Sequence, residues 1–295
     1  MTLEQLLDRF DGVERSIVVV NRTDPEPVLN MLVDTFGDDA VDVIGESVTA
    51  ADRGDANGPV IDVDALRRND AVPFDGTDSE TIENLVLLVE GDEVIAGSTL
   101  GELGDAVLFV NSDLYITGTR SLDDVDLPAV ITGLDDTAFT LRGYPESNRQ
   151  KLLLITISRF IERAAWVAGD GIIRSSFQRL SRIDDEVGTR DVYERVAAAG
   201  VDTHLYGELD DVPSDLDAVI HGGDSRDFTD SWFVVYRPPG GPQSVGTSAP
   251  DNLKRGLEGG VGLLAVEAKP RVWRGIWTFD PDRVRAMNRY IERNL

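Results

Sequence analysis

The order of hydrophobic patterns in the second half of this 295-residue chain constrains its fold most strongly. An apolar stripe at helical spacing covers residues 153–167 and ends at the Gly-Asp-Gly turn 169–171. Short helices are predicted next, over residues 177–183 and 189–200. A C-terminal helix is predicted after Asp280. Between the helix at 189–200 and this last helix lie five predicted strands, rich in β-branched and aromatic residues, at 201–207, 217–222, 231–237, 262–269 and 274–279. Helices, then a run of strands and a final helix predict an α+β fold with a mostly antiparallel sheet.

The first half of the chain predicts an α/β segment. A continuous β-branched strand at 16–21, a helix capped by Asp24 and a strand at 40–45 indicate a β-α-β unit. Residues 84–98 have the pattern of a hairpin that turns at 90–92. The remaining predictions are a helix at 3–10, a solvated insertion or mobile loop at 49–80, and a strand or short helix at 105–111.

Turn residues and charges dominate between residues 119 and 147, which predicts a linker there. We therefore expect an acidic α/β module at 1–118, the linker at 119–147 and a second domain at 148–295. The charge distribution favours this division, because the first 150 residues carry 32 acidic and nine basic groups and the remainder 22 and 19. A Pro-, Gly- and Ser-rich segment at 238–260 joins two predicted strands, either as an insertion or as a flexible lid.

The composition narrows the classes of site that the chain can contain. Its net charge of −26, with three lysines among 28 basic residues, indicates adaptation to a cytoplasm at high salt, where the Debye length falls to ~3 Å at 1 M. The absence of cysteine excludes disulfides, thiolate metal sites and cysteine nucleophiles. The two histidines, His204 and His221, cannot form a metal site by themselves. We expect both to be half-buried residues of neighbouring strands; the alternative is that they act as a proton switch or bind a ligand. Because no apolar run approaches ~20 residues, we expect a cytoplasmic protein with no membrane partner.

The tryptophans are the candidate ligand-binding residues, and all of them lie in the second half: Trp166, Trp232, Trp273 and Trp277. Trp273 and Trp277 are four residues apart on one predicted strand, which suits a shared pocket wall and a shared core equally. Glu162 shares a helix face with Trp166 and, if buried, needs a donor such as Arg179 or Arg174. The full candidate set adds Tyr206, Glu162, Arg163 and Arg179; the competing interpretation of Glu162 and Arg163 is a solvated surface pair. No catalytic constellation emerges, and we expect no enzyme activity.

Residues 142–182 are locally basic, with eight basic and three acidic side chains. A helix, a three-residue break and an arginine-bearing helix are compatible with a helix-turn-helix, in which Arg174, Arg179 and Arg182 would contact nucleic acid. The negative charge of the whole protein opposes the approach of phosphates, so nucleic acid is not the partner that we expect. A nucleic-acid-associated regulator is the alternative; otherwise these arginines pair with the acidic first module or dock a partner.

Five segments of the second half resemble the DICT sensory domain in its haloarchaeal, stand-alone form: ISRFIERAAW (157–166), SFQRLSRI (176–183), DVYERVAAAGVDTHLYG (191–207), DSWFVVYR (230–237) and RGIWTFDPDRV (274–284). The order of elements also resembles that of GAF-type sensor domains, at the level of the fold alone. The DICT resemblance implies a signal-input role and supplies no ligand or catalytic residue. We therefore expect a non-catalytic sensor or adaptor that acts by binding a small ligand or another signalling protein; its cofactor is unknown. Self-association is left open, and a purely structural assembly factor is a third class.

Overall fold

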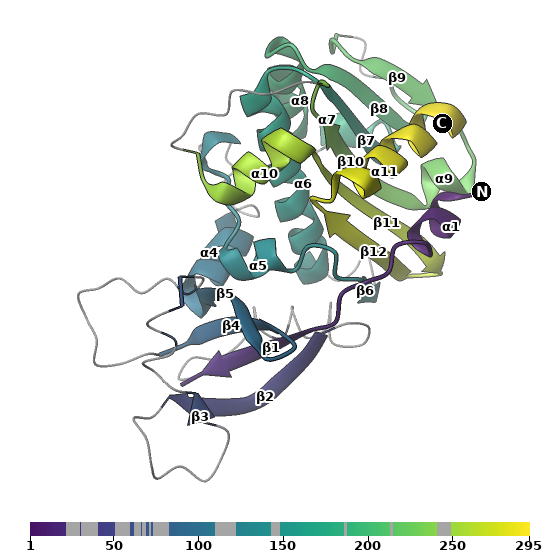
Figure 1. Cartoon of the computed structure of the whole chain (residues 1–295). Coiled ribbons are helices and arrows are strands. Elements are labelled where there is room, and N and C mark those ends of the chain that lie inside the picture. The colour runs from purple at the N-terminus through teal and green to yellow at the C-terminus, as the bar shows by residue number, and fades with distance from the viewer. Residues whose placement is uncertain are drawn as a thin grey trace.

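The computed structural model describes residues 1–21, 30, 41–50, 60–61, 66, 69–70, 72, 83–109, 122–142, 148–185, 188–212, 215–240 and 249–295. These residues form two β-sheets, which occupy separate parts of the molecule (Figure 1). The smaller sheet comes from the first half of the chain, and the larger one from the second half together with one strand of the predicted linker. This architecture confirms the predicted α+β class.

The smaller sheet has the strand order β3-β2-β1-β4-β5. Its strands are β1 (Arg15–Val20), β2 (Val41–Ala50), β3 (Val60–Ile61), β4 (Leu85–Glu90) and β5 (Glu93–Thr99). β1 and β2 are parallel, as a β-α-β unit requires, and β4 and β5 form the predicted hairpin. In β1, Ile17 and Val19 belong to one hydrophobic cluster and Val18 and Val20 to another. The apolar run of β1 is uninterrupted because both of its faces are buried.

Two helices lie beside the smaller sheet, α4 (Leu100–Phe109) and α5 (Ala129–Gly133). The segment predicted as a strand or a short helix at 105–111 is therefore helical as far as residue 109. α5 packs against β4 and β5, and a Cβ atom at Gly133 would lie 2.8 Å from Cδ2 of Leu88. A residue without a side chain is needed there so that the end of α5 can approach the sheet. This approach sets the position of the turn that follows α5.

The larger sheet has the strand order β6-β12-β11-β10-β7-β8-β9. Its strands are β6 (Phe139–Arg142), β7 (Ile172–Arg179), β8 (Asp202–Glu208), β9 (Val219–Gly222), β10 (Ser231–Arg237), β11 (Val261–Lys269) and β12 (Val272–Thr278). The pairings from β6 to β7 are antiparallel, and those of β7 with β8 and of β8 with β9 are parallel. The prediction of a mostly antiparallel sheet is confirmed, with a parallel edge.

Helices cover both faces of the larger sheet. One face carries α6 (Asn148–Ala168), α8 (Thr189–Ala198) and α10 (Asp251–Gly259); the other carries α1 (Leu3–Leu7), α9 (Arg226–Thr229) and α11 (Pro281–Asn294). β10 supplies both cores by alternation, because Val234 and Tyr236 lie in the cluster with α6 while Phe233 and Val235 lie in the cluster with α11. None of the helices in the described part of the chain is long and apolar enough to cross a membrane.

The predicted helix at 177–183 is wrong for most of its length. Residues up to Arg179 belong to the interior strand β7, and only a short helix, α7 (Arg182–Asp185), follows it. The Gly-Asp-Gly break ends α6 as predicted, and Gly171, at φ +94°, lies where a Cβ atom would be 2.6 Å from the carbonyl oxygen of Arg237. Glycine therefore allows β7 to start beside β10, and the chain enters the sheet directly. The helix–break–helix layout behind the helix-turn-helix alternative is absent.

Three other segments pack differently from the sequence expectation. Helix α1, placed by the sequence in the first module, packs on the larger sheet, where Leu3, Leu6 and Leu7 join the cluster of α11. β6 lies within the predicted linker 119–147 but pairs with β12. The segment 238–260 includes α10, whose buried leucines pack with α6, so this part of the segment is a packed helix and not a flexible lid. The predicted helix that starts at Asp24 lies outside the described residues except for Asn30. Much of the 49–80 segment also lies outside them, but its described residues include strand β3 and the buried Leu66 and Val72, which pack with the smaller sheet.

Candidate functional site

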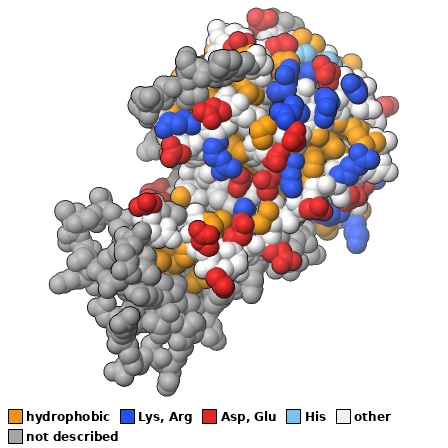
Figure 2. All heavy atoms as spheres, viewed as in Figure 1, with side chains coloured by type: hydrophobic (Ala, Val, Ile, Leu, Met, Phe, Trp, Pro, Cys, Tyr) orange, Lys and Arg blue, Asp and Glu red, His pale blue; other side chains and the backbone are white. Residues whose placement is uncertain are grey.

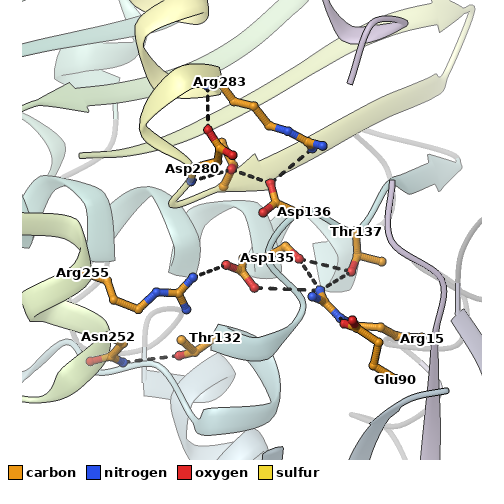
Figure 3. Close-up of polar contacts among 11 residues, drawn as sticks. Arg15, Glu90, Thr132, Asp135, Asp136, Thr137, Asn252, Arg255, Asp280 and Arg283 are labelled. Atoms are coloured by element: carbon orange, nitrogen blue, oxygen red, sulfur yellow. Dashed lines mark hydrogen bonds and ion pairs between the residues drawn. The ribbon is translucent and has the colours of Figure 1, made fainter. Parts of the chain in front are cut away.

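A network of charged side chains lies where the smaller sheet meets the larger body (Figure 3). We call it the polar junction; it comprises Arg15, Glu90, Asp135, Asp136, Thr137, Arg255 and Arg283. Arg15 and Glu90 belong to strands of the smaller sheet, whereas Arg255 and Arg283 belong to helices α10 and α11 of the larger body. The turn after α5, which contains both aspartates, stands between them.

The backbone of this turn is bonded on both sides. The amide of Asp136 donates to the carbonyl oxygen of Trp277 at the end of β12, at 2.8 Å. Its own carbonyl accepts from the amide of Val13, which leads into β1, at 2.9 Å. Asp136 holds a left-handed backbone conformation, at φ +58°, which aspartate tolerates better than most residues. The turn is therefore a fixed link between the two sheets.

Asp135 places a carboxylate between arginines from the two units of the molecule, which are the smaller sheet with its helices and the larger sheet with its helices. It is only 6% exposed, and its Oδ2 lies 2.6 Å from Nη2 of Arg255. On the other side, Nη1 of Arg15 lies 3.8 Å from Oδ1 and donates to the backbone carbonyl of Asp135. The same nitrogen donates to Thr137 Oγ1 at 2.8 Å, and Nε of Arg15 donates to Glu90 at 3.1 Å. One guanidinium of the smaller sheet thus reaches several groups of the turn.

The pKa of Asp135 is raised above its ordinary value, because burial removes water from the carboxylate. The nearby Arg255 acts in the opposite direction, as does Arg15, but the cost of desolvation is larger. Ionisation of this carboxylate is therefore less favourable in the folded protein than in water. A small displacement of either arginine changes the cost of keeping that charge.

Asp136 connects the same turn to the start of helix α11. Thr278 Oγ1 donates to Asp136 Oδ1 at 2.5 Å, and Nη1 of Arg283 lies 3.2 Å from the same oxygen. The threonine oxygen also accepts from the amide of Asp280, which caps α11 through the amides of Asp282 and Arg283. The first turn of α11 is consequently tied to the residue next to Asp135 (Figure 3).

The four tryptophans all contact one hydrophobic cluster, which lies on the α6 face of the larger sheet and continues to Ile17 and Val19 of the smaller sheet. Trp273 and Trp277 are core residues, 4% and 0% exposed, and Trp277 meets Phe279 edge-on at 5.2 Å. Trp166 and Trp232 are partly buried against the same cluster, and the indole nitrogen of Trp232 donates to Ser158 at 3.1 Å. The structure therefore gathers these side chains into a packed core, which is the competing interpretation of the sequence.

The other candidate ligand-binding residues lie in different places. Glu162 is buried in an ion pair with Arg159, and Arg163 binds the carbonyl oxygen of Val125. Arg179 pairs with Glu208, with its side chain 64% exposed. Tyr206 lies in the cluster on the opposite face of the sheet from the tryptophans. The eight candidates do not converge on one site.

The three arginines of the nucleic-acid alternative differ in burial and in bonding partners. Arg174 is buried, at 3% exposed, and bonds to Asn288 and Tyr206. Arg182 donates to Gln178, four residues before it, and Arg179 is the surface residue described above. Within the part of the chain that the structure covers, no group of three or more His, Asp or Glu side chains could hold a metal ion.

Sequence reasoning missed the residues of the polar junction. Asp135 and Asp136 lie in the segment predicted as a linker, and they are two of 54 acidic residues. The one available signal was the sequence ITGLDDT at 131–137, in which an apolar stretch and a glycine precede two aspartates. That pattern marks a turn but does not indicate that its carboxylates are buried.

The structure defines a two-sheet α+β protein whose units share one hydrophobic cluster and also meet at a buried, charged turn. Comparison with known proteins adds no relative: no family model, curated protein or solved structure matches the chain significantly. The DICT resemblance therefore stays a prediction from the sequence.

Proposed function

We propose that this protein is a non-catalytic sensory or adaptor module in which the binding of a ligand or partner to one unit changes its contact with the other. The polar junction is the element through which this change passes. The proposal commits to coupling between the two units and leaves the identity of the signal to experiment.

The observation that carries the proposal is the double attachment of the turn after α5. Arg15 bonds to it from the smaller sheet, while Arg255 and Arg283 bond to it from the larger body. Its buried carboxylate, Asp135, is costly to keep ionised, as the raised pKa shows. A ligand that binds one arrangement of the units more tightly than the other shifts the population toward the first.

Tryptophan emission gives a first test, because Trp277 is in contact with the polar junction. Its carbonyl oxygen accepts from the amide of Asp136, and its ring contacts Phe279, over which the guanidinium of Arg255 stacks at 4.4 Å. A panel of nucleotides, amino acids and organic acids is titrated against the protein. We expect at least one compound to give a saturable change in emission, and the Asp135→Asn variant to weaken the response.

A distance measurement tests the coupling itself. The chain has no cysteine, so Glu93→Cys on β5 and Lys269→Cys on β11 give two unique spin-label sites, one on each sheet. We expect Arg15→Gln to shift or broaden the distance distribution by double electron–electron resonance. Arg190→Gln, which removes an exposed pair with Asp184 inside the larger body, is the control and leaves it unchanged. An unchanged distribution in Arg15→Gln, together with a panel that gives no response, overturns the proposal.

A further inference from the structure

Both histidines of the chain lie together at the parallel edge of the larger sheet, far in sequence from the polar junction. His204 Nδ1 is 2.9 Å from His221 Nε2, and the ring of His221 stacks on that of Tyr206 at 4.3 Å. In the strand registers Arg174 pairs with His204 and Tyr206 with His221, so the four side chains come from three neighbouring strands. We call Arg174, His204, Tyr206 and His221 the histidine cluster.

Arg174 brings a positive charge into this cluster from β7. Its Nη1 donates to the hydroxyl of Tyr206 at 2.6 Å, and its Nε donates to Asn288 of α11 at 2.9 Å. These two partners are neutral and hold the guanidinium in place without balancing its charge. The carboxylate of Glu292 lies 3.7 Å from Nη2, beyond hydrogen-bond distance, on a side chain that is 54% exposed. An enclosed guanidinium with so loose a counter-charge is a favourable place for an oxyanion.

The histidines give the cluster a second, adjustable source of positive charge. Nε2 of His204 lies 3.1 Å from a carboxylate oxygen of Asp202, and its Nδ1 shares one hydrogen bond with Nε2 of His221, for which either ring can supply the proton. The pKa of His221 is lowered, first by burial and then by the positive charges of His204 and Arg174. An anion beside His221 opposes all three effects, so anion binding and proton uptake by His221 favour each other.

His204 and His221 are partly exposed, whereas Tyr206 and Arg174 are buried, with Nη2 of Arg174 lying 3.7 Å from the exposed Glu292 of helix α11. Figure 2 shows histidine at the surface next to a group of Lys and Arg side chains, on the face that carries this helix. On α11, Asn288 and Glu292 are four residues apart, and Arg285 and Arg289 lie on the same flank by helical spacing. Arg285 pairs with Asp282 at 2.5 Å, so this flank carries carboxylates as well as arginines.

We propose that the histidine cluster is a binding site for a small oxyanion, a phosphate or carboxylate group, which takes the place of Glu292 beside Arg174. The bound group accepts from the free side of the Arg174 guanidinium and from His221. This site lies apart from the polar junction, and it stands or falls independently of the function proposed above.

The two histidines give a direct readout, because the protein has only two imidazole C2–H groups, which a carbon-correlated proton spectrum separates from the backbone amides. Sodium sulfate, sodium phosphate and sodium acetate are each titrated at constant ionic strength and pH, with chloride as the balancing ion. Sulfate keeps its charge across the range used. We expect a saturable shift of the His221 signal, assigned with His221→Gln, and tighter sulfate binding at about pH 6 than at about pH 8. The phosphate and acetate arms decide which oxyanion class the site prefers.

Glu292→Gln is the decisive variant, since it removes the competing carboxylate from an exposed position. We expect it to raise the affinity for sulfate by about three- to tenfold. The matched control is Glu194→Gln, which removes the same charge from the exposed face of α8 and leaves the affinity unchanged. Tyr206→Phe removes the hydroxyl that accepts from Arg174, and we expect this variant to lower the affinity for sulfate. A linear response without saturation, or an equal gain in both glutamate variants, overturns the proposal.

Discussion

Glu162 and Asp135 are both buried carboxylates paired with arginine, and they differ in where their partners come from. Glu162 bonds to Arg159 one helical turn earlier, at 2.5 Å, and accepts from Tyr193 of α8 at 2.7 Å. All of these groups belong to one face of the larger sheet. Asp135 instead takes Arg15 from the smaller sheet and Arg255 from the larger body. The first arrangement holds one unit together, whereas the second makes a charge depend on how two units meet.

The largest expected effect comes from the carboxylate inside one unit. Glu162→Ala leaves Arg159 buried without its ion-pair partner, and we expect it to lower the free energy of unfolding by about 3–5 kcal/mol. Denaturant unfolding followed by tryptophan fluorescence measures the loss. Glu162→Gln, which keeps the shape and can still accept from Tyr193, loses less. A loss below about 1 kcal/mol in the alanine variant contradicts the comparison.

An intermediate effect is expected from the arginines of the polar junction. Arg15→Gln removes several hydrogen bonds from a nearly buried guanidinium, and we expect it to cost about 1–3 kcal/mol of unfolding free energy. Because Arg15 and Arg255 share Asp135, a double-mutant cycle with Arg255→Gln gives a coupling energy of about 0.5 kcal/mol or more. Additive losses show that the two units do not communicate through this carboxylate.

The smallest change in stability is expected from Asp135→Asn, at under about 1 kcal/mol near neutral pH, because burial already disfavours the ionised carboxylate. The pH dependence is the sharper measurement. A raised pKa means that the folded protein binds the proton more tightly, so this group contributes stability at low pH that is lost as the pH rises through its folded pKa. Subtracting the Asp135→Asn profile from that of the unchanged protein isolates the contribution. A flat difference refutes the assignment.

Most strands of the larger sheet could be predicted because their buried and exposed positions follow simple patterns, but β7 could not. Its polar residues Arg174, Ser176 and Gln178 lie on one face and are buried, where a strand pattern would predict hydrophobic residues. Their partners come from elsewhere: Asn288 of α11 for Arg174, and the carbonyl oxygen of Ser231 for the other two. A strand stabilised by distant donors and acceptors does not show the usual hydrophobic period.

Whether the tryptophans form a pocket wall or a core also depends on groups that are distant in the sequence. Residues four apart on a strand share a face, and the sequence correctly grouped Trp273 with Trp277, but nothing local separates a pocket wall from a packed core. Gly275, between them, shows how the space is filled: a Cβ atom there would lie 2.3 Å from the ring of Phe139. That ring comes from β6, in the segment that the sequence assigned to a linker.

The sequence by itself determined the elements whose signals are local. The cap formed by Asp280 before Pro281, the hairpin of β4 and β5 and the apolar stripe of α6 all depend on hydrogen bonds and periodicities that span a few residues. Only the tertiary structure decided which charges are buried and what they bond to. Asp135 and Arg255 are 120 residues apart, and the cost of desolvating a carboxylate depends on every group that displaces its water.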